Sequence, residues 1–159
     1  MRSEESLKDR PGKVVVEIER LPHGEGLPYP AYMSEHAVGM DVCAAIEGEI
    51  EVGPGDIVLC PTGFKVAIPE AFELQIRPRS GLAIRHGLTV VNAPGTIDPD
   101  YRGEVKIGLI NLGRHPVTIR RGDRVAQMVL QPRFVIEWKE VEGLSSTSRG
   151  DGGFGHTGT

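Results

Sequence analysis

Short apolar runs rich in β-branched residues extend over most of this chain, and nearly every run is closed by glycine or proline. The 159 residues include 21 glycines and 12 prolines, which interrupt any pattern long enough for an extended helix. Several short strands with regularly spaced turn residues are typical of an all-β sandwich or barrel. The expected strands are 13–19, 40–45, 48–52, 56–60, 64–68, 72–78, 88–91, 104–111, 116–120, 124–130 and 134–141. The sequence therefore predicts one all-β domain.

One segment, SGLAIRHG at 80–87, is compatible with a short helix. Ser80 is the expected N-cap, because its hydroxyl can accept a hydrogen bond from the first turn. Gly87 is the expected end, because glycine favours the left-handed conformation that closes a helix. No internal repeat is present.

The two ends of the chain differ in composition from its middle. Residues 1–12 are polar and aperiodic, and we expect them to form a flexible tail. Residues 13–142 are expected to form the β domain. Residues 143–159 are rich in glycine and small hydroxyl residues, with too little apolar surface to offset the entropy of ordering them. We expect this last segment to be disordered in the free protein.

Charge and composition exclude several classes of protein. The formal net charge of −4 argues against a nonspecific nucleic-acid binder, which needs a basic excess. No leader pattern and no apolar stretch of about 20 residues occurs, so we expect a soluble, cytoplasmic protein that binds no membrane. The five histidines lack the spacing of a transition-metal site, and any metal is expected to be Mg²⁺ carried in on phosphates. Cys43 and Cys60 are expected to be buried free thiols.

The stretch NAPGTIDPDYRG, residues 92–103, joins two expected strands and carries more chemistry than a turn needs. Asp100 and Gly103 fit the first and fourth positions of a type I turn, which gives Asp100 a structural role. Asp98 has no such role, so its carboxylate is free to accept a proton from a water molecule. Asp98 is the better candidate for a catalytic base, although turn chemistry alone explains a polar loop equally well.

Three further side chains are candidates for the site, and each also has a structural explanation. Arg79, within PRSGLA, stands where a strand meets the expected helix, a position suited to phosphate or to a plain N-cap beside a surface arginine. Gln127, within GDRVAQ, lies in an apolar run, where it can equally occupy the exposed face of a strand. Asp41, within VGMDVCAA, needs a partner, and a buried arginine would explain it as well as catalysis.

The C-terminal segment carries a charge, an aromatic ring and a hydroxyl close together in Arg149, Phe154 and Thr157. Arginine pairs with phosphate and an aromatic ring stacks on a base, so this segment can close over a nucleotide. A simple linker is the alternative, because low-complexity tails commonly have no other role.

Five stretches occur in a fixed order: VGMDVCAA, PRSGLA, NAPGTIDPDYRGEVKIGLIN, GDRVAQ and RGDGGFGHTG. In this combination the chain resembles the trimeric dUTP pyrophosphatase (dUTPase) family, from about Val14 to the C-terminus. The resemblance implies a jelly-roll-like (β-clip) all-β fold, a homotrimer, and active sites built from motifs of different subunits. It also implies Mg²⁺-assisted in-line attack of water on the α-phosphorus of dUTP. The products would be dUMP, a precursor for thymidylate synthesis, and pyrophosphate.

The resemblance also implies a role for each site residue. Asp98 would be the general base, and Tyr101 would pack under the deoxyribose and exclude a 2′-hydroxyl. Uracil would be bound by Asn92, by the backbone of Ala93, Gly95 and Lys106, and by the ring of Phe154. The phosphates would be bound by Arg79, Ser80, Gly81, Gln127, Arg149 and Thr157. Asp41 would be at most an outer-shell contributor to Mg²⁺, which no protein side chain would ligate directly.

Two other functions are compatible with parts of this pattern. A dCTP deaminase would share the fold and the trimer, but Asn92 and the intact IDPDYRG stretch favour uracil and hydrolysis. A nucleotide-sensing binding module would have no need for the base or the C-terminal segment, yet Asp98, Arg149 and Phe154 are all present.

Overall fold

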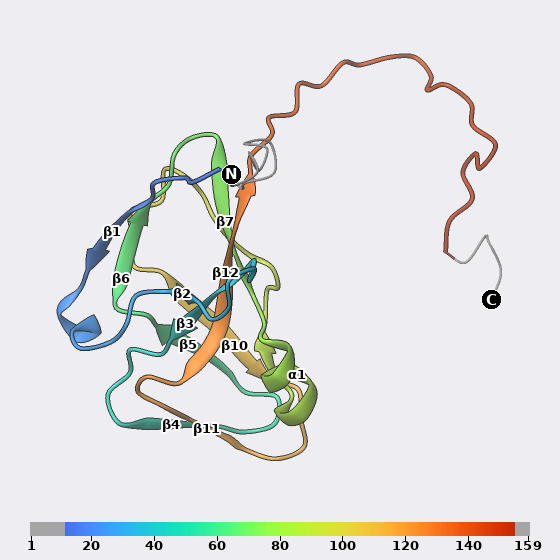
Figure 1. Cartoon of the computed structure of the whole chain (residues 1–159). Helices are drawn as coiled ribbons and strands as arrows, with labels where there is room; N and C mark the ends of the chain where they lie inside the picture. Colours follow the sequence, from blue (N-terminus) through green and yellow to red (C-terminus); the bar gives the residue numbers. More distant parts are fainter. Residues whose placement is uncertain (1–11, 155–159) are drawn as a thin grey trace, which may run out of the picture.

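The structure is a computed structural model that describes residues 12–154, and within these residues the chain forms twelve short strands and one α-helix (Figure 1). The strands are β1 (Glu17–Arg20), β2 (Ala31–Tyr32), β3 (Met40–Cys43), β4 (Glu49–Val52), β5 (Ile57–Pro61), β6 (Phe64–Ala67), β7 (Phe72–Arg77), β8 (Leu88–Val90), β9 (Gly95–Ile97), β10 (Lys106–Asn111), β11 (Val117–Arg120) and β12 (Arg124–Pro132). The helices are a 3₁₀ turn η1 (Pro22–Gly24) and α1 (Ser80–His86). The prediction of an all-β fold with one short helix is confirmed.

All strand pairs are antiparallel. The largest sheet has the order β2-β3-β12-β7-β9, a second sheet has the order β5-β10-β8, and β1-β6 and β4-β11 form two-stranded ribbons. The central strands β12 and β10, each of which pairs with a neighbour on both edges, supply much of the core. Fully buried examples are Ala126, Ile107 and Leu109. Burial of this apolar surface is the main stabilising contribution.

Helix α1 begins one residue earlier than expected. Arg79 is the N-cap residue, with an extended backbone, and Ser80 is the first helical residue, so the prediction of Ser80 as N-cap is wrong. No side chain caps this end. At the other end Gly87 adopts the left-handed conformation with φ 73° and closes the helix through a hydrogen bond from its N–H to the Ala83 carbonyl, as predicted.

The expected strand 134–141 is absent. In Figure 1 the chain leaves the body of the molecule after β12, and within residues 12–154 no strand pairs with this segment. Phe134, Ile136 and Trp138 are exposed. A strand forms only where a neighbour supplies the ladder of backbone hydrogen bonds, and one copy of the chain provides none here.

The two thiols are free, as expected. Cys60 is buried, and that burial, with a smaller effect of the Glu104 charge, raises the pKa of its thiol to about 12. Cys43 is only half-buried, so the expectation that it is buried holds less well. In the described part of the chain, no helix has the length and hydropathy required to cross a membrane.

Candidate active site

An open gap separates β9 from β10, the two strands on either side of the turn in the 92–105 loop. β9 ends the largest sheet, pairing only with β7, whereas β10 pairs with β5 and β8, so no ladder joins β9 to β10. A cavity of about 330 Å³ lies between them, lined in part by Asn92, Gly95, Lys106 and Gly108. This size falls within the range of small-molecule sites, roughly 300–1,000 Å³. Edge backbone groups beside an amide side chain can form hydrogen bonds to a planar base.

The turn at the tip of the loop begins at Asp98. The Tyr101 N–H donates to the Asp98 carbonyl at 3.1 Å, so Pro99 and Asp100 are the central residues. The expected turn from Asp100 to Gly103 is therefore wrong by two residues, because Pro99 fits the second position of the turn that does form. The Asp98 side chain is exposed and makes no hydrogen bond or ion pair within the described residues. Its carboxylate is free to accept a proton.

A second cavity adjoins the first on the Asp98 side. Its lining includes Asp98, Tyr101, Glu104 and Lys106, and it shares Lys106 with the first cavity. The Tyr101 hydroxyl donates to the Glu104 carbonyl at 3.0 Å. A Cβ at Gly103 would collide with the Tyr101 ring, so the ring lies directly against this glycine. The two contacts hold the aromatic ring beside the candidate base.

Charged side chains from three separate motifs meet at Asp41. Its Oδ2 lies 3.1 Å from Arg124 Nη1 and 3.4 Å from Arg79 Nε. Arg79 Nη1 also donates to the Arg124 carbonyl at 2.7 Å. Asp41 lies on β3, Arg124 begins β12, and Arg79 caps α1. The arginine partner that the sequence left open is thus present twice, and the two guanidinium groups form a positively charged site suited to phosphates.

Gln127 is part of the same site. Its Nε2 donates to the Pro78 carbonyl at 2.9 Å, which fixes it against the segment that leads into α1. Its Oε1 lies where the Cβ of a side chain at Gly39 would be, so in this arrangement Gln127 packs directly against Gly39. Ser80 and Gly81 follow Arg79 and are exposed. We call Asp41, Arg79, Arg124 and Gln127 the arginine cluster.

The structure does not join all the predicted residues within one chain. Among residues 12–154, no hydrogen bond or ion pair connects the arginine cluster to Asn92, Asp98 or Tyr101. Arg149 donates to the nearby Gly152 carbonyl at 2.7 Å, and Phe154 is fully exposed on the segment that leaves the body. Thr157 lies outside the described residues.

Two residues beside the loop were missed by the sequence analysis, His23 and Glu104. Their side chains meet at 2.5 Å although 81 residues separate them. No local sequence pattern predicts a contact between residues so far apart. Among the described residues, no group of three or more His, Cys, Asp or Glu side chains is arranged to hold a metal ion.

Comparisons with known proteins place these features in context. The family model described as dUTPase matches residues 26–158. The deoxyuridine 5′-triphosphate nucleotidohydrolase of Desulfotalea psychrophila is 63% identical over 134 residues, which are 84% of this chain and 89% of the relative. The enzyme of the same name from Caldanaerobacter subterraneus subsp. tengcongensis is 53% identical over 145 residues, 91% of this chain and 98% of the relative.

The fold is also found among solved structures. A mutant dUTPase from phage phi11 of S. aureus, described with a coordinated structural Mg(II) ion, aligns with a TM-score of 0.73 and 22% identity. The alignment covers 84% of this chain and all of the phage protein.

Proposed function

The chain belongs to the dUTPase family, whose members hydrolyse deoxyuridine 5′-triphosphate, and from this premise we propose how its own residues carry out that reaction. It hydrolyses dUTP to dUMP and pyrophosphate, which lowers dUTP and supplies dUMP. One observation carries the assignment of the site: the Asp98 carboxylate has no hydrogen bond or ion pair within the described residues. It lines a cavity next to the open gap between β9 and β10.

Asp98 is the general base. It takes a proton from a water molecule, which attacks the α-phosphorus in line with the leaving pyrophosphate. Because the carboxylate has no hydrogen bond or ion pair to another described residue, the base is not neutralised by a permanent partner. Positioning and charge neutralisation supply the rest of the catalysis.

The gap between β9 and β10 binds the nucleoside. Asn92 and the backbone of Ala93, Gly95 and Lys106 form hydrogen bonds to uracil, and a base with the wrong edge leaves those groups unpaired. Tyr101, held against Gly103, packs under the deoxyribose. A 2′-hydroxyl would have to displace the ring.

The arginine cluster binds the phosphates. Arg79, Ser80, Gly81 and Gln127 contact the triphosphate, and Asp41 holds the two guanidinium groups at a fixed spacing. Mg²⁺ would be carried in on the phosphates, and no described side chain would ligate it directly, with Asp41 at most an outer-shell contributor. When bound, it neutralises charge that develops on the phosphate oxygens.

The active site is completed by other copies of the chain in a homotrimer. Among residues 12–154 of one chain, no hydrogen bond or ion pair joins the loop with Asp98 to the arginine cluster, and the segment with Arg149 and Phe154 extends away from the body of the molecule (Figure 1). Each site would combine the loop of one subunit, the cluster of a second, and Arg149, Phe154 and Thr157 of a third. That last segment would close over the nucleotide and exclude bulk water.

Pyrophosphate release from each deoxynucleoside triphosphate tests the function. We expect release from dUTP and almost none from the others. Ammonia release from dCTP, without pyrophosphate release from dUTP, would instead identify a deaminase.

Subunit mixing tests the shared site. Asp98→Asn and Arg79→Ala homotrimers are each expected to be nearly inactive. Mixed trimers refolded from both should regain activity, because some sites then combine an intact Asp98 with an intact Arg79. Absence of any regain, with mixed trimers shown by mass analysis, would place the whole site in one subunit.

A further inference from the structure

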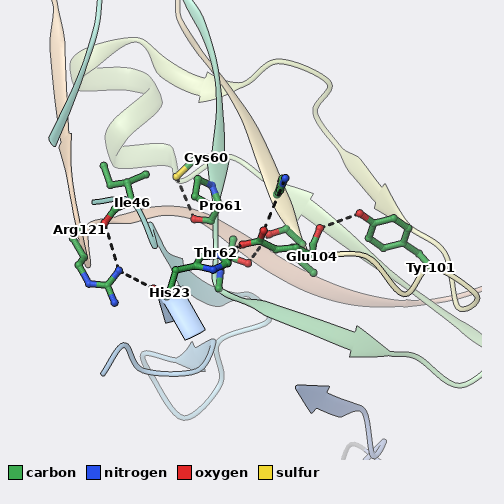
Figure 2. Close-up of polar contacts among 11 residues, drawn as sticks. His23, Ile46, Cys60, Pro61, Thr62, Tyr101, Glu104 and Arg121 are labelled. Carbon is green, nitrogen blue, oxygen red and sulfur yellow. Dashed lines mark hydrogen bonds and ion pairs between the residues drawn. The ribbon is translucent and has the colours of Figure 1, made fainter. Parts of the chain in front are cut away.

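A compact polar cluster is centred on Glu104, near the end of the 92–105 loop, which carries Asp98 and is called the catalytic loop below (Figure 2). Glu104 Oε1 accepts a hydrogen bond from the Gly63 N–H at 2.9 Å and lies 2.5 Å from His23 Nε2. Lys106 Nζ is 3.9 Å from the other carboxylate oxygen. The Glu104 side chain is only 13% exposed, whereas that of His23 is 39% exposed. The glutamate is thus the buried partner, and its orientation is fixed by groups from two other elements.

The backbone of the same residue holds Tyr101. The Glu104 carbonyl accepts the Tyr101 hydroxyl at 3.0 Å, as Figure 2 shows. Glu104 also lines two cavities, one with Asp98 and Tyr101 and one with His23. A shift of Glu104 would therefore move its backbone carbonyl, which accepts the Tyr101 hydroxyl, in the cavity that Asp98 also lines.

The residues next to Glu104 and His23 are held in place by further hydrogen bonds. The Val105 N–H donates to the Phe64 carbonyl at 3.0 Å, and the Thr62 hydroxyl donates to the Val105 carbonyl at 2.5 Å. His23 belongs to η1, whose backbone is held by Arg121, since Nη1 donates to the His23 carbonyl at 2.8 Å. The cluster thus ties η1 and the β5–β6 turn to the catalytic loop.

Electrostatics favour an ionised Glu104. Burial alone would raise the pKa of this carboxyl, but hydrogen bonds from His23 and Gly63 and the positive charges of His23 and Lys106 outweigh burial and lower it. An ionised carboxylate strengthens both hydrogen bonds it accepts. The ionised form of Glu104 therefore favours both contacts.

We propose that Glu104, held by His23 and Gly63, is a positioning residue that fixes Tyr101 and thereby sets how strongly the enzyme prefers dUTP over UTP. This inference rests on the proposed role of Tyr101 at the deoxyribose. Glu104 does not touch the substrate; it acts through the Tyr101 hydroxyl.

The test is the ratio of kcat/KM for dUTP to that for UTP, measured by pyrophosphate release. Glu104→Ala removes the carboxylate, and Glu104→Asp keeps its charge but cannot reach both Gly63 and His23. Each should lower the ratio by roughly 10- to 100-fold, the range set by loss of a hydrogen bond to a charged group. Glu104→Gln, which still accepts the Gly63 N–H, should restore most of the ratio. If Glu104→Ala does not fold, Glu104→Asp carries the test.

A double-mutant cycle separates positioning from general loss of structure. Tyr101→Phe removes the hydroxyl that donates to the Glu104 carbonyl. Adding Glu104→Ala to Tyr101→Phe should therefore lower the dUTP-to-UTP ratio of kcat/KM little further. Fully additive effects would overturn the proposal. Glu49→Ala is the matched control, because it breaks an exposed ion pair with Arg120 far along the chain and should leave the ratio unchanged.

The outcomes also distinguish this proposal from its premises. A wild-type protein that releases no pyrophosphate from dUTP would contradict the proposed function itself. A Tyr101→Ala variant with a wild-type ratio would overturn both the role of Tyr101 and this inference. Relaxed selectivity in Tyr101→Ala, with wild-type ratios in Glu104→Ala and Glu104→Asp, would overturn the inference alone.

Discussion

Asp41 Oδ2 lies 3.1 Å from Arg124 Nη1, although 83 residues separate the two in sequence. The contact forms because β3 and β12 pair in the largest sheet with Gln127 opposite Asp41 and a register shift between Arg124 and Ala126. This pairing brings a carboxylate and a guanidinium group from distant motifs together, and the guanidinium group of Arg79 joins them from the start of α1.

Asp41→Asn should weaken catalysis without unfolding the protein. The asparagine fills the same space but removes the charge that keeps two guanidinium groups close together, so they repel and lose their spacing. We expect kcat/KM for dUTP to fall roughly 10- to 100-fold, as for loss of a hydrogen bond to a charged group. Steady-state kinetics with a melting curve checks this. Unchanged kcat/KM would show that the arginines keep their positions without Asp41.

Asp98→Asn should bind dUTP normally but lose most turnover. The amide keeps the shape of the carboxylate and cannot accept a proton, so kcat should fall roughly 10²- to 10⁴-fold while the dissociation constant measured by calorimetry changes little. Asp100→Asn is the matched control two residues away and should retain activity. Near-normal kcat in Asp98→Asn would refute its assignment as the base.

Deletion of residues 145–159 should abolish hydrolysis and leave the β domain intact. Residues 145–151 are exposed and none belongs to a strand, so their loss removes no core contact and should change the melting temperature little. The deleted segment carries Arg149 and Phe154, which the proposed mechanism requires on the nucleotide. An active truncated enzyme with a normal KM would contradict the proposed role of this segment in hydrolysis.

The stability contribution of Glu104 should disappear in acid. Its pKa is lowered in the folded protein from the ordinary value of 4.5, so the folded state binds the proton less tightly than the unfolded state. The contribution is therefore fully present above pH 4.5 and is lost as the pH falls through the lowered pKa. Comparing the free energy of unfolding of wild type and Glu104→Gln from about pH 6 to about pH 3 should show a difference on the order of 1 kcal/mol that shrinks. A constant difference would contradict the role of the charge.

The pattern of short apolar runs closed by glycine or proline was enough to predict most strands. It located β12 and β10, where the same side chains that define the pattern are buried in the core. Glycine chemistry likewise predicted the end of α1 at Gly87. β2 and β9 were not predicted, because two- and three-residue strands have no period of their own and exist only through pairing with β3 and β7.

The sequence by itself also determined which residue types are available for chemistry, since Asp98, Tyr101 and the motif arginines are fixed by their order along the chain. Only the tertiary structure decided which of them meet. Antiparallel pairing brought Asp41 to Arg124, and the stacking of η1 on the β5–β6 turn brought His23 to Glu104. It also left 134–141 without a partner strand among residues 12–154. The reason is physical: local patterns record periodicity and turn preference, whereas contacts across 80 or more residues depend on strand register and packing.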